Sequence, residues 1–498
     1  MRWTLGNTRV MSQVTANRTA DSPLRIAIIG AGICGLSIAA RLSSLPGQKI
    51  PFQLYEARAE NEIGHGYGVT LQKKPWKDFV RRGLRLRGSD ATQAYEKISV
   101  DAIVGGVGKL KDASPEAAQR WQAIDRSLRK YILGYVAQEK IHWNHQLASL
   151  TRAPDRRGLV LKFKDGGETT ADLVIDTGGL RAPGFSALQK LPEPKLLPYV
   201  SYYGTRRISY QQYLEKFASF FGSGNTIEYA PATSHTPYIQ IKKVHHPNKS
   251  SSATPSSAPE NGIPDHTVEI RWVFSRAPRS DSDPLWRPNR TASEAKDIPP
   301  ELIEEILTMT RSPTFSDQQR TVLSSLFTKD NLSSDRILNW HLRLRLPGRP
   351  LLMDSKCDES EAYQIIALGD AAHGLPIIGS QGTNVALTDA ARFVEWYLRS
   401  QQRLTQDVGR DSFYADCRRL YLHWGKAAVL AVQRLRSIHG QEPFSDEVVG
   451  GIVGLDQEQM QQVHRARDSS ADEEDSDETE DSKEMAKLKI RKVPQSTL

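Results

Sequence analysis

The chain has 498 residues, of which 39% are hydrophobic, and a net charge of +8. This length excludes a single small domain and predicts two or three domains with hydrophobic cores of their own. No run of about 18 apolar residues occurs, so we expect no membrane-spanning helix. The three cysteines, Cys34, Cys357 and Cys417, form neither a disulfide framework nor a metal-ligand pattern, which is typical of a cytoplasmic protein.

The N-terminal segment carries arginines and no acidic residue before Asp21, and it lacks the apolar stretch of a secretory signal. We predict a disordered leader over residues 1–22, with a transit peptide as the alternative. From Asp468 to Leu498, ten Asp and Glu residues stand against five Lys and Arg, so about +13 remains on residues 1–467. This acidic end predicts a disordered tail over residues 466–498.

A basic body can attract nucleic acid, an anionic dinucleotide or an acidic substrate. Neither zinc-finger spacing nor an RNA-binding aromatic motif is present, so we expect no nucleic-acid partner. The histidines likewise show no metal-ligand spacing, and no metal site is expected.

The first chemical motif follows a short apolar stretch, Ile26–Ile29, which predicts a buried β-strand. Three glycines come next in the pattern G-x-G-x-x-G, at Gly30, Gly32 and Gly35, and helical spacing continues from Leu36 to Leu45. The first glycine permits a tight turn, the second allows close approach of a pyrophosphate, and the third lets the helix pack on the strand. The helix N-terminus then faces the phosphates.

A second predicted strand, Phe52–Tyr55, ends at Glu56, 21 residues after Gly35. A carboxylate at this place can accept hydrogen bonds from both ribose hydroxyls of a dinucleotide. The alternative is a tight strand–helix turn without a ligand. The motif and Glu56 together favour a dinucleotide site, but they do not distinguish FAD from NAD.

The middle of the chain, from Tyr199 to about Leu346, is rich in β-branched and aromatic residues with strand-like alternation. Alternation places Tyr202, Gly204 and Arg206 on one face of a strand, with Tyr203 and Thr205 on the other. We select Arg206 and Tyr238 as candidate catalytic or substrate-contacting residues, against the alternative that they form ordinary cross-strand pairs. The Ser/Pro-rich stretch 246–266 predicts a surface insertion.

A second strand–loop–helix unit follows near the end of the chain. Ile365–Leu368 predicts a strand, Gly369-Asp370 a turn, and a helix begins near Thr383 and extends to about Leu398. Asp370 stands where a carboxylate can bond a polyol hydroxyl. The loop before the helix can lay backbone N–H groups along a flavin ring edge, and a helix N-terminus there would stabilise negative charge. This loop is better suited to FAD than to NAD.

The stretch "GDAAHGLPIIGSQGTNVALTDA" resembles the Gly-Asp motif of the para-hydroxybenzoate hydroxylase-like, or group A, FAD-dependent monooxygenases. Its loop has one residue more than the common form, which is similar to many fungal members of the family. The G-x-G-x-x-G fingerprint and this motif also occur in the order found in the family.

The resemblance implies an α/β fold: a Rossmann-like FAD-binding domain of the GR2 type, discontinuous in sequence, with an inserted β-sheet substrate domain and a C-terminal helix. We expect the FAD-binding domain over residues 23–195 and 346–450, and the substrate domain over 196–345. The resemblance implies that FAD is bound by Gly30, Gly32, Gly35, Glu56, Val69, Arg129, Asp370, Gly379, Gly382, Thr383 and Asn384.

Two segments depart from the family pattern. In "IDRSLRKYIL" the spacing before Leu128-Arg129 is one residue short, so Arg129 is the expected pyrophosphate ligand and Arg126 the substitute. In "ADLVIDTGGLRAPG" Gly178 replaces the aspartate of the family's Asp-Gly pair, and Asp176 stands where its first glycine would be. This second change puts the usual nicotinamide geometry in doubt.

The family's chemistry implies that NAD(P)H reduces FAD, that O2 adds to form a flavin C4a-hydroperoxide, and that this species delivers oxygen to a small molecule. We therefore expect hydroxylation or epoxidation of an organic ring substrate in secondary-metabolite biosynthesis, without a protein nucleophile. His373 is interpreted as a packing residue rather than a base. A flavoprotein oxidase or reductase of the same fold is the alternative, and a non-catalytic scaffold is a third possibility. The sequence does not indicate the oligomeric state.

Overall fold

The computed structural model describes residues 25–45, 50–62, 68–72, 75–76, 79, 96–97, 100–101, 120–153, 158–188, 193–221, 226–229, 237–247, 266–346, 365–378, 382–403 and 410–472. The predicted leader 1–22, most of the predicted insertion 246–266 and residues 473–498 of the predicted tail lie outside them. The helix α14 (Gln457–Asp472) extends past residue 466, where the disordered tail was expected to begin. The other predicted domain boundaries stay predictions.

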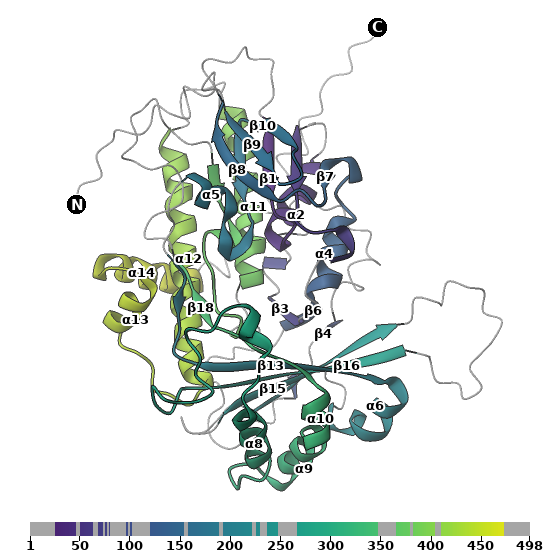
Figure 1. The fold of residues 1–498 in the computed structure, drawn as a ribbon. Coiled ribbons are helices and arrows are strands. Elements are labelled where there is room, and N and C mark those ends of the chain that lie inside the picture. The colour runs from purple at the N-terminus through teal and green to yellow at the C-terminus, as the bar shows by residue number, and fades with distance from the viewer. Residues whose placement is uncertain are drawn as a thin grey trace, which may run out of the picture.

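A five-stranded parallel sheet forms the centre of the first unit (Figure 1). Its strand order is β19-β11-β1-β2-β7, and every neighbouring pair is parallel. The strands are β1 (Ile26–Ile29), β2 (Phe52–Tyr55), β7 (Ile141–His142), β11 (Leu173–Asp176) and β19 (Ile365–Ala367). β1 is buried along its whole length, as expected for a central strand covered on both faces. This is the Rossmann-like arrangement predicted from the sequence.

The parallel sheet is discontinuous in sequence, because β19 joins it only after the chain has built a second unit. The helix α2 (Ile33–Ser43) follows β1 and contacts both α4 (Asp125–Leu133) and α11 (Gly382–Arg403). An antiparallel sheet packs against β2, where Tyr55 stacks on Phe163 with ring centroids 4.6 Å apart. Its strands are β8 (Leu147–Arg152), β9 (Leu159–Phe163) and β10 (Glu168–Ala171).

Several shorter elements complete the fold. A small antiparallel sheet has the order β3-β6-β4, and β12 pairs with β18. These elements are β3 (Gly68–Gln72), β4 (Glu96–Lys97), β6 (Arg120–Ile124), α5 (Pro183–Leu188), β12 (Lys195–Leu196) and β18 (Arg343–Leu344).

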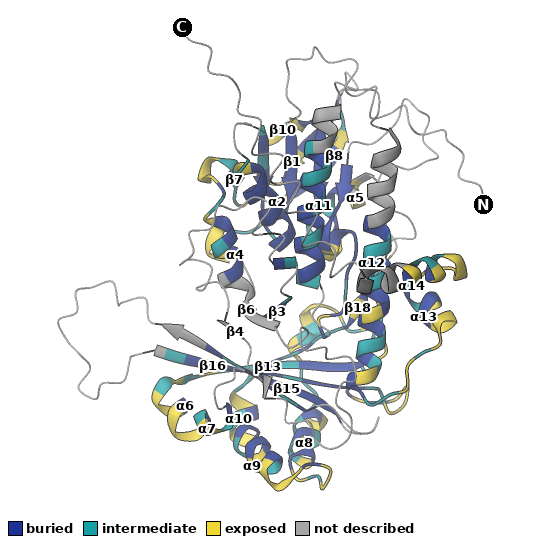
Figure 2. Ribbon diagram, turned by 180° about the vertical axis from the view of Figure 1, so that it is seen from behind, coloured by how far each residue is buried: buried dark blue, intermediate teal, exposed yellow. Residues whose placement is uncertain are grey.

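The second unit is a six-stranded sheet of order β17-β13-β16-β15-β14-β5. One of its faces is covered by helices, and the other is turned toward the first unit (Figures 1 and 2). The strands are β5 (Val100–Asp101), β13 (Val200–Ser209), β14 (Thr226–Tyr229), β15 (Tyr238–Pro247), β16 (His266–Arg276) and β17 (Arg336–Asn339). The helices are α6 (Tyr210–Lys216), α7 (Ala218–Phe221), α8 (Pro300–Met309), α9 (Asp317–Leu326) and α10 (Lys329–Ser334).

The two faces of this sheet have different partners. The helix face carries Tyr202, Ile241 and Trp272, which belong to a hydrophobic cluster shared with the covering helices. The opposite face, which we call the inner face, carries Tyr238 and Val273, which pack with the core of the first unit. The predicted alternation of β13 is confirmed, because the Trp272 ring on the helix face lies over Gly204, where a Cβ would come within 2.0 Å of it.

The C-terminal part contains more than the single helix expected. The helix α12 (Arg410–Ile438) runs from the first unit down to the six-stranded sheet (Figure 1), and α13 (Asp446–Val453) and α14 pack against it. Among the described helices, none combines the length and the apolar character that crossing a membrane requires.

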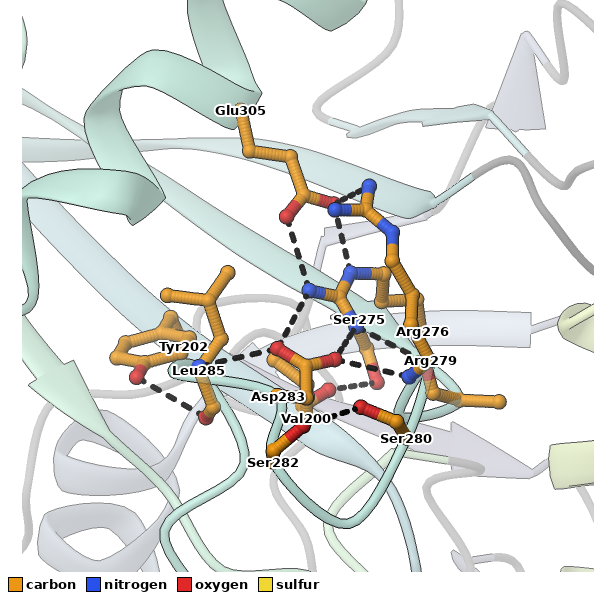
Figure 3. A network of polar contacts seen from close by, with 11 residues as sticks. Val200, Tyr202, Ser275, Arg276, Arg279, Ser280, Ser282, Asp283, Leu285 and Glu305 are labelled. Atoms are coloured by element: carbon orange, nitrogen blue, oxygen red, sulfur yellow. Dashed lines mark hydrogen bonds and ion pairs between the residues drawn. The ribbon is translucent and has the colours of Figure 1, made fainter.

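A buried ion-pair network lies at the C-terminal end of β16, around Arg276 (Figure 3). The guanidinium of Arg276 lies between two carboxylates, 2.5 Å from Asp283 Oδ2 and 2.6 Å from Glu305 Oε1. Asp283 also accepts the backbone N–H groups of Arg279 and Leu285 over 2.9 and 3.0 Å. Although burial opposes ionisation, the bond from Arg276 and these N–H groups hold the pKa of Asp283 at about 2.

We predict that Asp283→Asn lowers the free energy of unfolding by about 2 kcal/mol at pH 7, because a folded-state pKa below the ordinary value stabilises the ionised form. This contribution is complete above about pH 5 and disappears as the pH falls toward the folded-state pKa. Urea denaturation should therefore show a gap between wild type and variant that narrows in acid. Asp281→Asn, which changes an exposed carboxylate of the same loop, is the control. A gap of equal size at pH 7 and at low pH would contradict the assignment.

Candidate functional site

The glycine-rich turn after β1 is tightly packed. Gly30 has a φ of +100°, and a Cβ there would lie 2.8 Å from the carbonyl oxygen of Thr177. A Cβ at Gly35 would lie 2.1 Å from the carbonyl oxygen of Gly30. The helix α2 begins at Ile33, earlier than the sequence predicted. Gly35 lies in its first turn and has no side chain, so the helix can lie this close to the strand. Contacts within the protein therefore require both glycines.

Gly32 differs from the other two glycines. The nearest atom to a Cβ at this position would be the Thr177 carbonyl oxygen at 3.9 Å, so packing within the protein does not exclude a side chain. Gly32 is also the N-cap of α2, where no side chain caps the helix. The first N–H groups of α2 and its dipole favour an anion at this end. A pyrophosphate lying on an uncapped glycine turn fits this arrangement.

Arg129, from α4, brings a positive charge to the same turn. Its Nη1 donates to the carbonyl oxygen of Ala31 over 3.4 Å, and its side chain is buried. Leu128 and Ile132 anchor α4 in the core. The substitute candidate, Arg126, lies outside the residues whose side chains are described. A buried guanidinium beside an uncapped helix N-terminus is well placed to bind phosphate oxygens.

Glu56 lies at the end of β2, beside the glycine turn. Its Oε2 accepts the backbone N–H of Ala31 over 2.7 Å, and its Oε1 accepts that of Arg58 over 3.0 Å. These bonds fix the carboxylate and leave further lone pairs on both oxygens. Glu56 can therefore accept ribose hydroxyls while it remains bonded to the turn.

The second motif, at the end of β19, meets the first one directly. Gly369 has a φ of +61°, and a Cβ there would lie 2.9 Å from the Cβ of Cys34 in the first turn of α2. Asp370 is exposed beside this contact, and its Oδ1 would lie 3.6 Å from a Cβ at Gly382. Burial, together with the negative charges of Asp389 and Asp370, raises the pKa of the Cys34 thiol well above its ordinary value. The turn that carries Asp370 and the N-terminus of α2 thus form one surface.

The start of α11 is joined to β3, the strand expected to face a flavin ring. The side-chain oxygen of Asn384 accepts the backbone N–H of Gln72 over 2.8 Å. Val69, in the same strand, is buried and pairs with Ala123 of β6. Gly382 and Thr383 form the first turn of α11 with Asn384, whereas Gly379 lies outside the described residues.

A buried carboxylate, Asp389, holds the Gly369 turn in place. It accepts the backbone N–H of Gly369 over 2.9 Å, the ring N–H of His373 over 2.7 Å and the indole N–H of Trp424 over 2.8 Å. Although burial favours the neutral acid, these bonds and the charge of His373 hold the pKa of Asp389 below its ordinary value. His373 is fully buried in this network, as the packing interpretation requires.

Asp389 was not identified from the sequence. The available signal was an acidic residue inside an otherwise apolar helical stretch, "NVALTDAARFV", at a position that alternation on the helix places inward. A carboxylate at such a position needs a set of hydrogen-bond donors.

The altered Asp-Gly segment lies behind the first glycine turn. The hydroxyl of Thr177 donates to the carbonyl oxygens of Ile29 and Gly30 over 2.8 and 2.9 Å. Asp176 accepts the N–H of Gly178 over 2.9 Å. In this chain the segment therefore stabilises the glycine turn through the hydrogen bonds of Thr177 to its backbone.

Arg206 is placed differently from the prediction. Its guanidinium forms an ion pair with Asp335 at 2.7 Å and donates to the carbonyl oxygen of Leu326 over 3.1 Å. Both partners lie among the covering helices, on the helix face of the six-stranded sheet. Its guanidinium is bonded on the helix face and not on the inner face, so we no longer select Arg206 as a substrate contact.

Tyr238 lies on the inner face, and it stays a candidate. Its hydroxyl donates to Glu228 over 2.5 Å and accepts from Gln240 over 3.0 Å. Burial, followed by the negative charge of Glu228, raises the pKa of Tyr238 well above its ordinary value. The tyrosine is therefore a neutral hydrogen-bonding group at neutral pH.

The site as a whole fits an FAD molecule. An uncapped helix N-terminus and Arg129 can bind the pyrophosphate, and Glu56 can bind the adenosine ribose. Asp370 is exposed next to them, and the start of α11 and β3 lie together where a ring system would follow.

No family model matches the chain. Over 388 residues it is 26% identical to the FAD-dependent monooxygenase adaC of Aspergillus niger, a match that covers 74% of this chain and 84% of that protein. It is 24% identical over 409 residues to the FAD-dependent monooxygenase aptC of Emericella nidulans, which covers 77% of this chain and 88% of that protein.

The fold is similar to that of a solved FAD-containing monooxygenase of Photorhabdus luminescens. The TM-score is 0.57 at 18% sequence identity, and the match covers 84% of this chain and 98% of that one. By sequence the chain is similar to FAD-dependent monooxygenases of fungi, which are oxidoreductases, and it shares the fold of an FAD-containing monooxygenase.

Proposed function

We propose that the protein is an FAD-dependent monooxygenase that uses NAD(P)H and O2 to hydroxylate or epoxidise an organic ring substrate. The observation that carries the proposal is the contact of Gly369 with the first turn of α2, which brings Asp370 to the glycine turn. A nucleotide site alone would not need this second turn. The fungal relatives support a role in secondary-metabolite biosynthesis.

Each part of the site has a task in this proposal. When bound, FAD would supply the two-electron redox chemistry and the activation of O2. The N-terminus of α2 and Arg129 would bind the pyrophosphate, Glu56 would bind the ribose, and Asp370 would bind a hydroxyl of the ribityl chain. The N-terminus of α11 favours negative charge on the adjoining part of the ring system. The inner face of the six-stranded sheet holds the substrate and limits the access of water.

An oxidase or a reductase of the same fold is the second candidate. The observation that favours it is the segment Asp176–Gly178, where the family's Asp-Gly pair is replaced and the side chains support the glycine turn. A weakened nicotinamide interaction would leave the flavin to be reduced by the substrate itself.

We predict that the purified protein is yellow and that a suitable ring compound stimulates its consumption of NAD(P)H and O2. Oxygenated product should form in proportion to the NAD(P)H consumed, as measured by mass spectrometry with labelled O2. Stoichiometric H2O2 without a need for NAD(P)H would identify an oxidase instead. A protein that cannot be loaded with FAD would exclude both candidates.

Glu56→Gln should raise the dissociation constant for FAD about tenfold, because an amide lacks the charge and half of the acceptors of the carboxylate. The constant can be measured by titrating the apoprotein with FAD and following flavin fluorescence. Glu60→Gln, which changes an exposed glutamate in the next turn, is the matched control. Equal affinities of Glu56→Gln and wild type would remove Glu56 from the site.

Asp370→Ala should weaken FAD binding and abolish turnover, because it removes the exposed carboxylate at the meeting point of the two turns. Thermal unfolding of the apoprotein should be little changed, since the side chain is exposed. Unchanged activity of this variant would contradict the role of Asp370.

A further inference from the structure

The inner face of the six-stranded sheet carries positive charge that the neighbouring residues described by the structure do not fully neutralise. Lys242 on β15 stands opposite Arg271 on β16 in the register of the sheet. The two residues are 8% and 3% exposed, respectively. Both lie on the same face as Tyr238 and Gln240, since alternate residues of β15 share a face. Two adjacent, largely buried cationic residues therefore lie on the inner face.

Lys242 has no direct partner for its charge among the described residues. No hydrogen bond or ion pair there reaches its ammonium group, although a buried amine ordinarily has one. Burial lowers the pKa of Lys242 to about 8, and the charges of Arg271 and Arg434 lower it while that of Glu228 raises it. The amine is still mainly protonated at neutral pH, and no described carboxylate forms an ion pair with it.

The guanidinium of Arg271 is only partly hydrogen-bonded by the described residues. Its Nε forms an ion pair with Glu269, but its buried Nη1 has no hydrogen-bond partner in the described part of the chain. Glu269 is shared, because Arg207 also approaches it at 3.3 Å. The carboxylate therefore does not satisfy the guanidinium fully.

The remaining charges near the pair do not balance it. Arg434, from α12, adds a third positive charge that acts on both Lys242 and Tyr238. Glu228 is the neighbouring carboxylate, and one of its oxygens accepts the Tyr238 hydroxyl. Burying charge without a partner is costly, so an arrangement of this kind is stabilised by a bound anion.

We infer that Lys242 and Arg271 form a subsite that recognises an anionic oxygen of the substrate, either a carboxylate or an ionised enol or phenol. The inference rests on the proposed function, because it places the substrate on the inner face of the sheet. Arg434 supports the subsite through its charge, and the second amide N–H of Gln240 can donate to a neutral oxygen of the same molecule. The substrate class is then an acidic ring compound.

The test compares matched acidic and neutral ligands. One pair is a hydroxynaphthoic acid and its methyl ester, and the other is a hydroxynaphthoquinone, whose enol is ionised at neutral pH, and its methyl ether. Isothermal titration calorimetry on the FAD-loaded full chain gives each dissociation constant. We expect the acidic member of one pair to bind at least about tenfold more tightly than its neutral partner. The pair that shows this preference identifies the anionic group.

Lys242→Met should abolish the preference for the acid, and Lys242→Arg should retain most of it. The control is Lys243→Met, which removes the same charge from the next residue, whose ammonium donates to Tyr213 on the helix face. Its preference should equal that of wild type. Reduction of the flavin by NAD(P)H without any ring compound should be unchanged in Lys243→Met.

Three results would overturn the inference. They are a wild type without preference for either acid, a Lys242→Met variant that keeps the preference, and a Lys242→Met variant whose main defect is a raised KM for NAD(P)H. The last result would assign the cations to the nicotinamide co-substrate. Failure of the proposed function is distinguishable, because it would appear as a colourless protein or as a flavin that NAD(P)H does not reduce.

Discussion

The close contact between the Gly369 turn and the first turn of α2 is the constraint on which the candidate site depends. The two backbones approach so closely at Gly369 and Cys34 that a side chain on the glycine would collide with the cysteine. The buried carboxylate of Asp389 maintains this contact through donors from the turn, from His373 and from Trp424. A carboxylate without water is stable only with such a complete set of donors. The turn, α11 and α12 are consequently fixed as one body, and Asp370 is presented beside α2.

Much of the nucleotide half of the site could be predicted, because its causes are local. A strand that turns sharply into a helix needs glycine at Gly30 and Gly35, and the structure shows the contacts that exclude any larger residue. The position of Glu56 follows from the length of one strand–helix–strand unit. The parallel pairing of β1 with β2 could be predicted for the same reason, since a helix lies between these two strands in the sequence. The site roles of these residues stay predictions until the cofactor is bound.

The substrate half could not be predicted, because it depends on contacts between distant segments. Alternation correctly separated the two faces of β13, but it could not indicate which face the helices would cover. Arg206 forms an ion pair with Asp335, which lies far from it in the sequence. Lys242 and Arg271 became neighbours only through the pairing of β15 with β16. Asp389 was overlooked because its donors come from two distant segments, the turn with Gly369 and His373 and the helix α12 with Trp424.

The order in which the chain builds the parallel sheet has a consequence for its biogenesis. The turn at Gly30 forms early, but β19 and Asp370 join it only after the six-stranded sheet has been made. Pairing of segments so distant in sequence is slow, because a large loop must close first. Tight binding of FAD would therefore wait for nearly the entire chain, and the cofactor would stabilise the completed protein by mass action while leaving partly synthesised chains unaided. Retention of the flavin would thus report that the last strand of the sheet has been inserted.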